Sequence, residues 1–146
     1  MMYFNEISRL LQQKAPFVYV DRVLELEENK RIVSIKNVSG SEAFTALHFP
    51  GNAVYPGIFI IESIAQTASI LLSKSDEISL REGQFLALGG IQRLQFMRAV
   101  KPGDTLRIEV EIIKAVGQMA IVKAVVKIED TVTAEGQMTF GVGKNE

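Results

Sequence analysis

Residues 56 to 73 read PGIFIIESIAQTASILLS, and this stretch decides the fold. Proline suits the first turn of a helix, and no helix breaker follows until after Ser73. Isoleucine, leucine and alanine occur on every side of the helix that this stretch would form. A helix that is apolar all round is surrounded by protein rather than resting on a surface. We therefore predict a long buried helix from Pro56 to about Ser73.

Strand-forming segments precede and follow this helix. Residues 17–26 and 31–38 are rich in valine, isoleucine and leucine, and the turn residues 28–30 between them predict a hairpin. Four more candidate strands follow the helix, at 84–95, 105–115, 119–128 and 131–142. Charged and apolar residues alternate strictly over 107–112, which is typical of a sheet with one wet face.

The order of these elements predicts the fold class. A short amphipathic helix, capped by Asn5 and closed by Pro16, precedes the hairpin, and no linker or repeat divides residues 1–146. One long apolar helix and one antiparallel sheet give a single two-layer α+β domain. We predict a hot-dog fold, in which the curved antiparallel sheet wraps around the central helix. Because such a sheet has open edges, we also expect a dimer at least.

Composition excludes several classes of function. Hydrophobic residues make up 47% and charged residues 23%, which is ordinary globular composition. The net charge of −1 does not favour nucleic acid or an anionic membrane as a partner. The absence of cysteine excludes disulfides and thiolate chemistry. With no signal peptide and no stretch long enough to cross a membrane, we expect a soluble cytoplasmic protein.

His48 is the only histidine, and it lies in an irregular segment between Ser39 and Tyr55. So long a segment without regular structure is uncommon in a compact domain unless it has a function. A neutral imidazole can act as a general base near neutral pH. A loop histidine held by one hydrogen bond is the alternative. A multi-histidine metal site is excluded, and no carboxylate cluster accompanies the imidazole.

Glu62 lies inside the most apolar helix of the chain. Burial of an ionised carboxylate without a partner costs several kcal/mol, so the side chain is either paired or has a raised pKa. A raised pKa would let it donate a proton near neutral pH. Gln66, four residues on, shares its face and could bind Glu62 or a substrate. The alternative is a structural salt bridge to Arg93 or Arg98.

The start of the helix offers a third chemical group. Pro56 and Gly57 place free backbone N–H groups at the positive end of a helix dipole. Gly57 has no side chain to prevent a ligand oxygen from approaching its N–H. Such an end could polarise a thioester carbonyl and stabilise an enolate, although it could also be an ordinary helix start. Base, acid and oxyanion donor together would suit elimination of water beside a carbonyl.

A specific resemblance supports this chemistry. Residues 48–66, HFPGNAVYPGIFIIESIAQ, closely resemble the active-site signature of bacterial 3-hydroxyacyl-acyl-carrier-protein dehydratases. Residues 16–23, PFVYVDRV, and 36–39, KNVS, are similar to the segments that precede the signature in this family. Phe96, Arg98, Val100 and residues 102–104 match the segment that follows it.

The resemblance implies roles for individual residues and for partners. It makes His48 and Glu62 the catalytic pair, with His48 from one subunit and Glu62 from the other in each active site of a homodimer. It implies trimers of dimers in many members, no cofactor and no metal. It also implies an acyl substrate on the phosphopantetheine arm of acyl carrier protein, in a tunnel beside the long helix. We expect Phe49, Pro56, Gly57 and Gln66 to contact the substrate.

The chain departs from the family pattern at several positions. A usual Leu-Pro-His-Arg run is replaced around Gln12, Gln13, Lys14 and Ala15, and Leu47 replaces the usual glycine before the histidine. Leu86 and Ala87 stand where aromatic residues often close the tunnel, and Gln95 and Met97 where basic residues are common. These differences concern the preferred length of the acyl chain and the identity of the carrier protein. They are compatible with a specialised dehydratase of a polyketide or polyene pathway. A hot-dog thioester hydrolase and a non-catalytic acyl-binding subunit are the competing hypotheses.

Overall fold

The structure is a computed structural model that describes residues 1–145. Two α-helices, one short 3₁₀ helix (η1) and six strands make up these residues. Their bounds in chain order are α1 Phe4–Leu10, β1 Arg22–Glu27, β2 Arg31–Asn37, η1 Ala43–Ala46, α2 Gly57–Ser73, β3 Gln84–Phe96, β4 Thr105–Val116, β5 Met119–Ile128 and β6 Thr131–Lys144.

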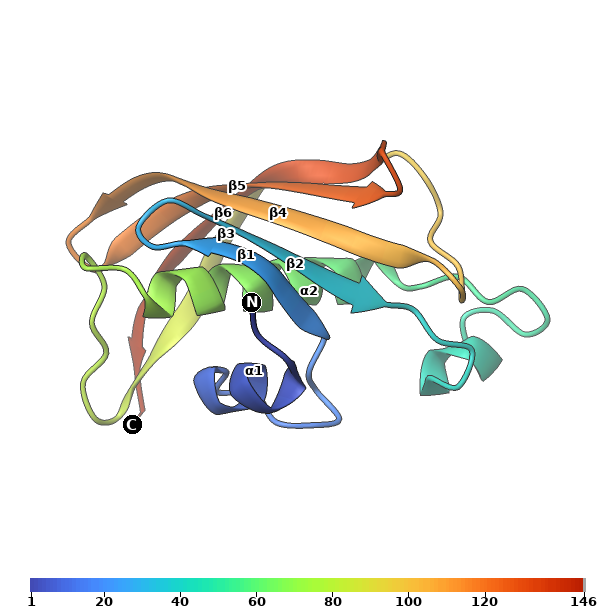
Figure 1. Cartoon of the computed structure of the whole chain (residues 1–146), viewed down its shortest axis with the longest axis horizontal. Helices are drawn as coiled ribbons and strands as arrows, with labels where there is room; N and C mark the ends of the chain where they lie inside the picture. The colour runs from blue at the N-terminus through green and yellow to red at the C-terminus, as the bar shows by residue number, and fades with distance from the viewer. Residues whose placement is uncertain (146) are drawn as a thin grey trace.

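All six strands form one antiparallel sheet in the order β1-β2-β4-β5-β6-β3. Figure 1 shows this sheet arching over α2, with α1 on the other side of the long helix. The predicted hot-dog fold is therefore confirmed. The strand that follows α2 in sequence pairs only with β6, so β3 and β1 are the two edges of the sheet.

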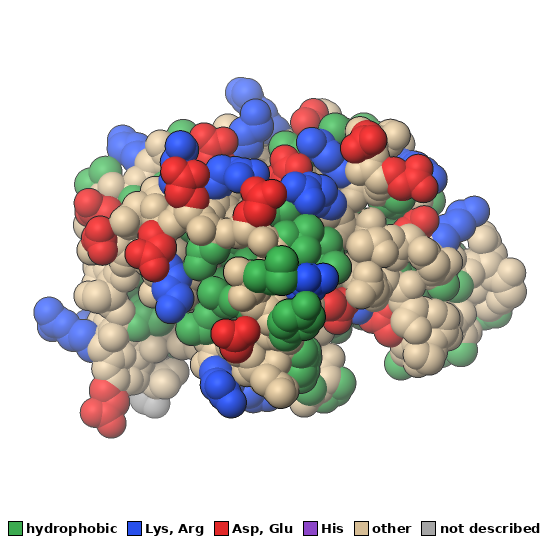
Figure 2. All heavy atoms as spheres, in the orientation of Figure 1, with side chains coloured by type: hydrophobic (Ala, Val, Ile, Leu, Met, Phe, Trp, Pro, Cys, Tyr) green, Lys and Arg blue, Asp and Glu red, His purple; other side chains and the backbone are tan. Residues whose placement is uncertain are grey.

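The two faces of the sheet differ as the alternation predicts. In β4, Leu106, Ile108 and Val110 are buried, whereas Arg107 and Glu109 face outward. The buried residues pack with α2 in a single hydrophobic core. On the face drawn in Figure 2, acidic and basic side chains intermingle over the outer surface of the sheet, and neither sign dominates.

The long helix is buried along most of its length but not at its start. Its buried residues are Ile60, Ser63–Ala68 and Ile70–Leu72. Ile58 in the first turn is 70% exposed, and Phe59, Ile61 and Glu62 are only partly buried. A single chain therefore covers the carboxyl-terminal part of α2 and leaves apolar side chains of its first turns uncovered. No helix within residues 1–145 is long and apolar enough to cross a membrane.

Two local predictions near the N-terminus were wrong. Tyr3, not Asn5, is the N-cap of α1, and the Tyr3 N–H donates to the Glu6 carboxylate at 3.2 Å. The first strand begins at Arg22 rather than at residue 17, because part of the preceding segment binds α2 instead of the sheet. The backbone N–H of Tyr19 donates to the Gln66 side chain at 2.7 Å.

Candidate active site

The segment that connects β2 to α2 fixes the orientation of His48. The His48 N–H donates to the carbonyl of Phe44 in η1 at 2.8 Å, and the Val54 N–H donates to the carbonyl of His48 at 2.8 Å. The imidazole Nδ1 lies 2.8 Å from the carbonyl oxygen of Val54. Because a carbonyl can only accept, this bond places the proton of the neutral imidazole on Nδ1. Nε2 is then free to accept a proton, as a general base requires.

His48 borders a largely apolar cavity of about 630 Å³. The rings of Tyr19 and Phe59 stack at 5.1 Å, and Phe44 meets Tyr55 edge-to-face at 5.3 Å. Phe44 also meets Phe59 edge-to-face at 6.4 Å, so these side chains attach both the segment before β1 and the His48 segment to the first turn of α2. The residues that line the cavity are Pro16, Phe17, Tyr19, Ser41, Glu42, Ala43, Phe44, Leu47, His48, Pro56 and Phe59. An apolar wall with a few polar groups is typical of small-molecule sites.

The amino-terminal end of α2 carries free donors. Pro56 is the N-cap, and its carbonyl accepts from the N–H groups of Phe59 and Ile60 at 2.9 and 3.3 Å. The N–H groups of Gly57 and Ile58 have no partner within residues 1–145. No side chain caps the helix, so these two donors and the positive end of its dipole are available to an oxygen ligand. Phe96 of β3 lies over Gly57, where an added methyl group would make van der Waals contact with its ring at 3.4 Å.

Glu62 lies one turn further along α2 and is held by Gln66. The Gln66 Nε2 donates to Glu62 Oε1 at 3.0 Å, and no lysine or arginine among residues 1–145 lies within ion-pair distance of the carboxylate. The alternative of a salt bridge to Arg93 or Arg98 is therefore wrong for the single chain. Oε2 makes no hydrogen bond within the described residues, which leaves one carboxylate oxygen for a ligand.

Gln66 is fully buried and uses its whole amide group. Its Nε2 also donates to the Phe17 carbonyl at 3.0 Å, and its Oε1 accepts from the Tyr19 N–H at 2.7 Å. Both amide protons are thus engaged. The predicted bond to Glu62 is present, and neither amide proton of Gln66 is left without a partner in the single chain.

The structure brings some of the predicted residues together and separates others. His48 and Pro56 line the same cavity, while Gly57 lines a neighbouring one beside Phe96. The Phe49 ring stacks on the imidazole at 4.0 Å and is half exposed. Glu62 does not line the His48 cavity. Within one chain, the two residues of the predicted catalytic pair therefore do not form a common site.

Two tyrosines near the site have altered acidity. Burial raises the pKa of the Tyr19 phenol, and the charges of Glu62 and Glu42 raise it further. Burial also raises the pKa of Tyr55 well above its ordinary value, an effect that the nearby Ser63 hydroxyl opposes and the Glu42 charge adds to. Neither the Tyr55 nor the Ser63 hydroxyl has a hydrogen-bond partner of good geometry within residues 1–145. Both phenols thus stay neutral and are unsuited to act as bases.

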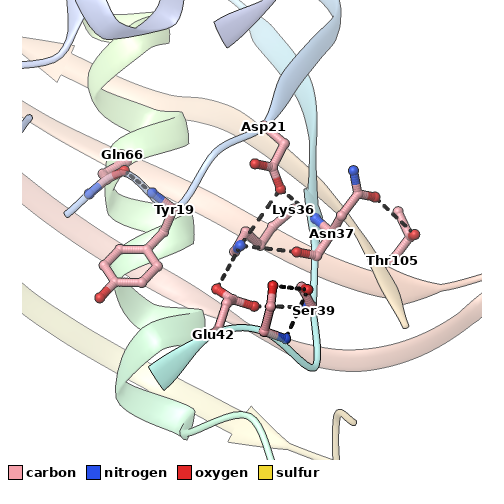
Figure 3. Close-up of polar contacts among 9 residues, drawn as sticks. Tyr19, Asp21, Lys36, Asn37, Ser39, Glu42, Gln66 and Thr105 are labelled. Atoms are coloured by element: carbon pink, nitrogen blue, oxygen red, sulfur yellow. Dashed lines mark hydrogen bonds and ion pairs between the residues drawn. The ribbon is translucent and has the colours of Figure 1, made fainter. Parts of the chain in front are cut away.

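Sequence reasoning missed a buried ionic cluster next to this site. Figure 3 shows Lys36 of β2 between the carboxylates of Asp21 and Glu42, close to the hydrogen bond from the Tyr19 N–H to Gln66. The Lys36 side chain is only 7% exposed. One signal could have identified it, because Lys36 follows Ile32 and Ser34 at the inward-facing positions of its strand.

A second cavity lies at the other end of α2. It has a volume of about 410 Å³ and combines leucine and isoleucine side chains with serine and glutamine side chains at its border. Ser69, which is seven residues beyond Glu62 and hence on the same face of α2, is part of the wall. The other lining residues are Leu10, Gln12, Gln13, Leu72, Ser73, Ser75, Ile78, Ser79, Leu80 and Leu86.

No group of three histidine, aspartate or glutamate side chains suitable for a metal ion occurs in the part of the chain that the structure describes. The chemistry available at the site is thus that of an imidazole, a carboxyl group and backbone N–H donors.

Comparisons with known proteins agree with this inventory. The model of the FabA-like domain family matches residues 11–137. The 3-hydroxyacyl-(acyl-carrier-protein) dehydratase FabZ of Bacillus cytotoxicus is 39% identical over 146 residues, covering 100% of this chain and 99% of the relative. Two solved structures share the fold at low identity. The dehydratase heterocomplex ApeI:P from Xenorhabdus doucetiae has a TM-score of 0.73 at 18% identity, over 94% of this chain and 91% of that chain. Thioesterase HI1161 from Haemophilus influenzae has a TM-score of 0.67 at 14% identity, over 99% and 92%.

Proposed function

The chain belongs to the FabA-like family, and we propose that His48 and Glu62 are its catalytic residues. Each active site of the homodimer combines His48 of one subunit with Glu62 of the other. The protein is a 3-hydroxyacyl-acyl-carrier-protein dehydratase of fatty acid biosynthesis, a hydro-lyase. It converts a 3-hydroxyacyl thioester into a trans-2-enoyl thioester and water. The observation that supports the assignment of His48 is its geometry: Nδ1 is held by the Val54 carbonyl, which leaves Nε2 as the nitrogen that can accept a proton.

The elimination uses three groups. His48 Nε2 removes the proton from Cα of the substrate, and the electron pair forms the Cα–Cβ double bond as the C–O bond at Cβ breaks. Glu62 delivers a proton to the departing hydroxyl through Oε2, because Gln66 occupies Oε1. The free N–H groups of Gly57 and Ile58 hold the thioester oxygen, where negative charge develops when the α-proton leaves.

The proposal of a two-subunit site is supported by what a single chain lacks. His48 and Glu62 of one chain do not line one cavity, and the apolar first turn of α2 is uncovered. The 13-residue edge strand β3 lies next to this turn, with Leu88, Ile91 and Phe96 partly exposed along it. An open edge with apolar side chains favours pairing with a second copy. Pairing through β3 would cover the first turn of α2 and bring the His48 segment of one chain to the Glu62 face of the other.

The substrate reaches this site on the phosphopantetheine arm of acyl carrier protein. We place the acyl chain along α2, in the direction of the 410 Å³ cavity that contains Ser69 and Leu72. Ser69 is seven residues from Glu62, which is about 10 Å along a helix.

The test of the two-subunit site is complementation between inactive variants. His48→Ala and Glu62→Ala should each lower the rate of enoyl formation by about 100-fold or more. A heterodimer of the two variants, purified with two different tags, contains one intact site and one site that lacks both groups. It should regain about half the wild-type rate per dimer. A heterodimer as inactive as its parents would show that His48 and Glu62 of the same chain act together.

The reaction itself has a separate readout. Enoyl absorbance should rise when the protein meets a carrier-bound 3-hydroxyacyl thioester and fall with the enoyl thioester and water. Release of free thiol without enoyl product would instead indicate a thioester hydrolase. The control for complementation is the heterodimer of wild type with the double variant His48→Ala/Glu62→Ala, purified with the same two tags. This heterodimer has no intact site and should be inactive.

A further inference from the structure

The buried ionic cluster lies where the His48 segment leaves the sheet. Lys36 is the penultimate residue of β2, and its side chain points to the inner face, as do Ile32 and Ser34. The Nζ atom lies 2.9 Å from Glu42 Oε1 and 3.7 Å from Asp21 Oδ2, and it donates to the Asn37 carbonyl at 3.0 Å. The ammonium group therefore donates a hydrogen bond to one carbonyl and forms ion pairs with two carboxylates.

Glu42 connects this ammonium group to the segment that carries His48. While Oε1 binds Lys36, Oε2 accepts from the Ser39 N–H at 2.8 Å (Figure 3). Glu42 is also the N-cap residue of η1, and its carbonyl accepts from the Thr45 hydroxyl at 2.9 Å. Both carboxylate oxygens are thus engaged, and the backbone of Glu42 starts the short helix that ends just before His48.

The helix η1 contacts His48 directly. The Phe44 carbonyl accepts from the His48 N–H at 2.8 Å, and the Phe44 ring packs on Tyr55. The imidazole is therefore positioned by a short path from Lys36 through Glu42 and η1. Asp21 is the second carboxylate beside Lys36, and its Oδ2 is fixed by the Asn37 N–H, which donates to it at 2.6 Å.

We propose that Lys36 is a positioning residue for catalysis, which holds the His48 segment through Glu42 in the orientation that the elimination requires. This inference rests on the proposed function, in which His48 is the base. The physical reason is that a buried cation between two carboxylates has one low-energy arrangement, whereas a neutral side chain would leave two carboxylates to repel each other. A displacement of the imidazole by about 1 Å can lower a rate by about 100-fold.

The test compares variants of Lys36 with a surface lysine. Lys36→Met should lower kcat about 10- to 100-fold and change KM less than about threefold, because the groups at the start of α2 that hold the thioester are untouched. Lys36→Arg keeps the cation and should retain more activity than the methionine variant. Lys30→Met is the matched control, since the Lys30–Glu27 ion pair is more than half exposed and Lys30 precedes β2, at the opposite end of the strand from Lys36.

A second comparison separates positioning from loss of folded protein. In the His48→Ala background, Lys36→Met should cause no further loss of the residual rate, because there is no imidazole left to orient. An equal loss in both backgrounds would overturn the proposal, as would unchanged kcat in folded Lys36→Met or an arginine variant as impaired as the methionine variant. If Lys36→Met does not fold, Glu42→Gln decides: about tenfold lower kcat supports the proposal and full activity overturns it. Full activity of His48→Ala would instead refute the proposed function itself.

Discussion

Replacement of Gln66 by methionine, which has a similar length and no amide, should weaken both the fold and the reaction. The amide makes hydrogen bonds of 2.7, 3.0 and 3.0 Å to Tyr19, Phe17 and Glu62, and it is fully buried. Each bond contributes about 1 kcal/mol net, so the loss is about 3 kcal/mol in the free energy of unfolding. For a chain of this size, that is roughly 10 °C in Tm.

The effect on the rate should be smaller than that of removing the acid. Without Gln66, Glu62 keeps its carboxyl group and loses only the donor that fixes Oε1, so we expect kcat to fall about tenfold rather than 100-fold.

Urea unfolding at fixed protein concentration and the enoyl absorbance assay measure the two effects of Gln66→Met separately. Gln118→Met is the matched control, because that glutamine is exposed in the β4–β5 turn and makes a single bond to Ser79 at 3.2 Å. A loss of stability below about 1 kcal/mol would refute the idea that the Gln66 hydrogen bonds hold the segment before β1 against α2. A rate as low as that of Glu62→Ala would show that Gln66 acts on the substrate, as the sequence suggested.

Three further substitutions test other features of the site and the sheet. Gly57→Ala should leave Tm unchanged or higher, since the new methyl group lies 3.4 Å from Phe96 and alanine favours a helix. Its kcat should nevertheless fall about tenfold, because the methyl group obstructs the N–H groups that hold the thioester oxygen. Tyr55→Phe should change the unfolding free energy at neutral pH by less than about 1 kcal/mol, because its buried hydroxyl has no good partner within residues 1–145. Since burial raises the pKa of Tyr55 in the folded state, wild type should lose stability as pH rises above about 10, and unfolding curves of the phenylalanine variant should show less of this loss. Burial tends to raise the pKa of Glu109, but hydrogen bonds to an arginine and a lysine outweigh burial and lower the pKa in the folded state. The contribution of Glu109 to the free energy of unfolding is therefore present at neutral pH and lost as pH falls through the folded-state pKa. Glu109→Gln should make stability less sensitive to acid, as measured by urea unfolding across that pH range.

Local patterns predicted most of the fold. β5 begins and ends where its alternation begins and ends, and α2 ends at the predicted Ser73. Both elements are specified by residues close in sequence, through side-chain periodicity and turn residues. The first strand was predicted too long because residues 17–21 have the composition of a strand, while the backbone N–H of Tyr19 bonds to a side chain 47 residues away. Composition cannot reveal a partner so distant in the sequence.

The candidate site was predicted only in part for the same reason. His48, Gly57 and Glu62 lie in one continuous signature, so a resemblance could identify them together. Lys36, Asp21 and Glu42 come from three separate segments and meet only because β2 places Lys36 on the inner face of the sheet. Their ionic cluster depends on strand register, which the sequence of any one segment does not determine.

Glu62 is less buried in the single chain than the sequence predicts. The sequence predicts burial because isoleucines surround the carboxylate, yet in the single chain Glu62 is partly exposed and Ile58, one turn earlier, is 70% exposed. An apolar helix turn left in water is costly, and the strand β3 beside it, with Phe96 over Gly57, has one open edge. A second copy that covers this surface would bury the isoleucine and exclude water from the side of α2 that carries the carboxylate. Dimer formation would then also supply the histidine that the Glu62 site of a single chain lacks. A dissociated subunit should therefore be inactive even with His48 and Glu62 intact.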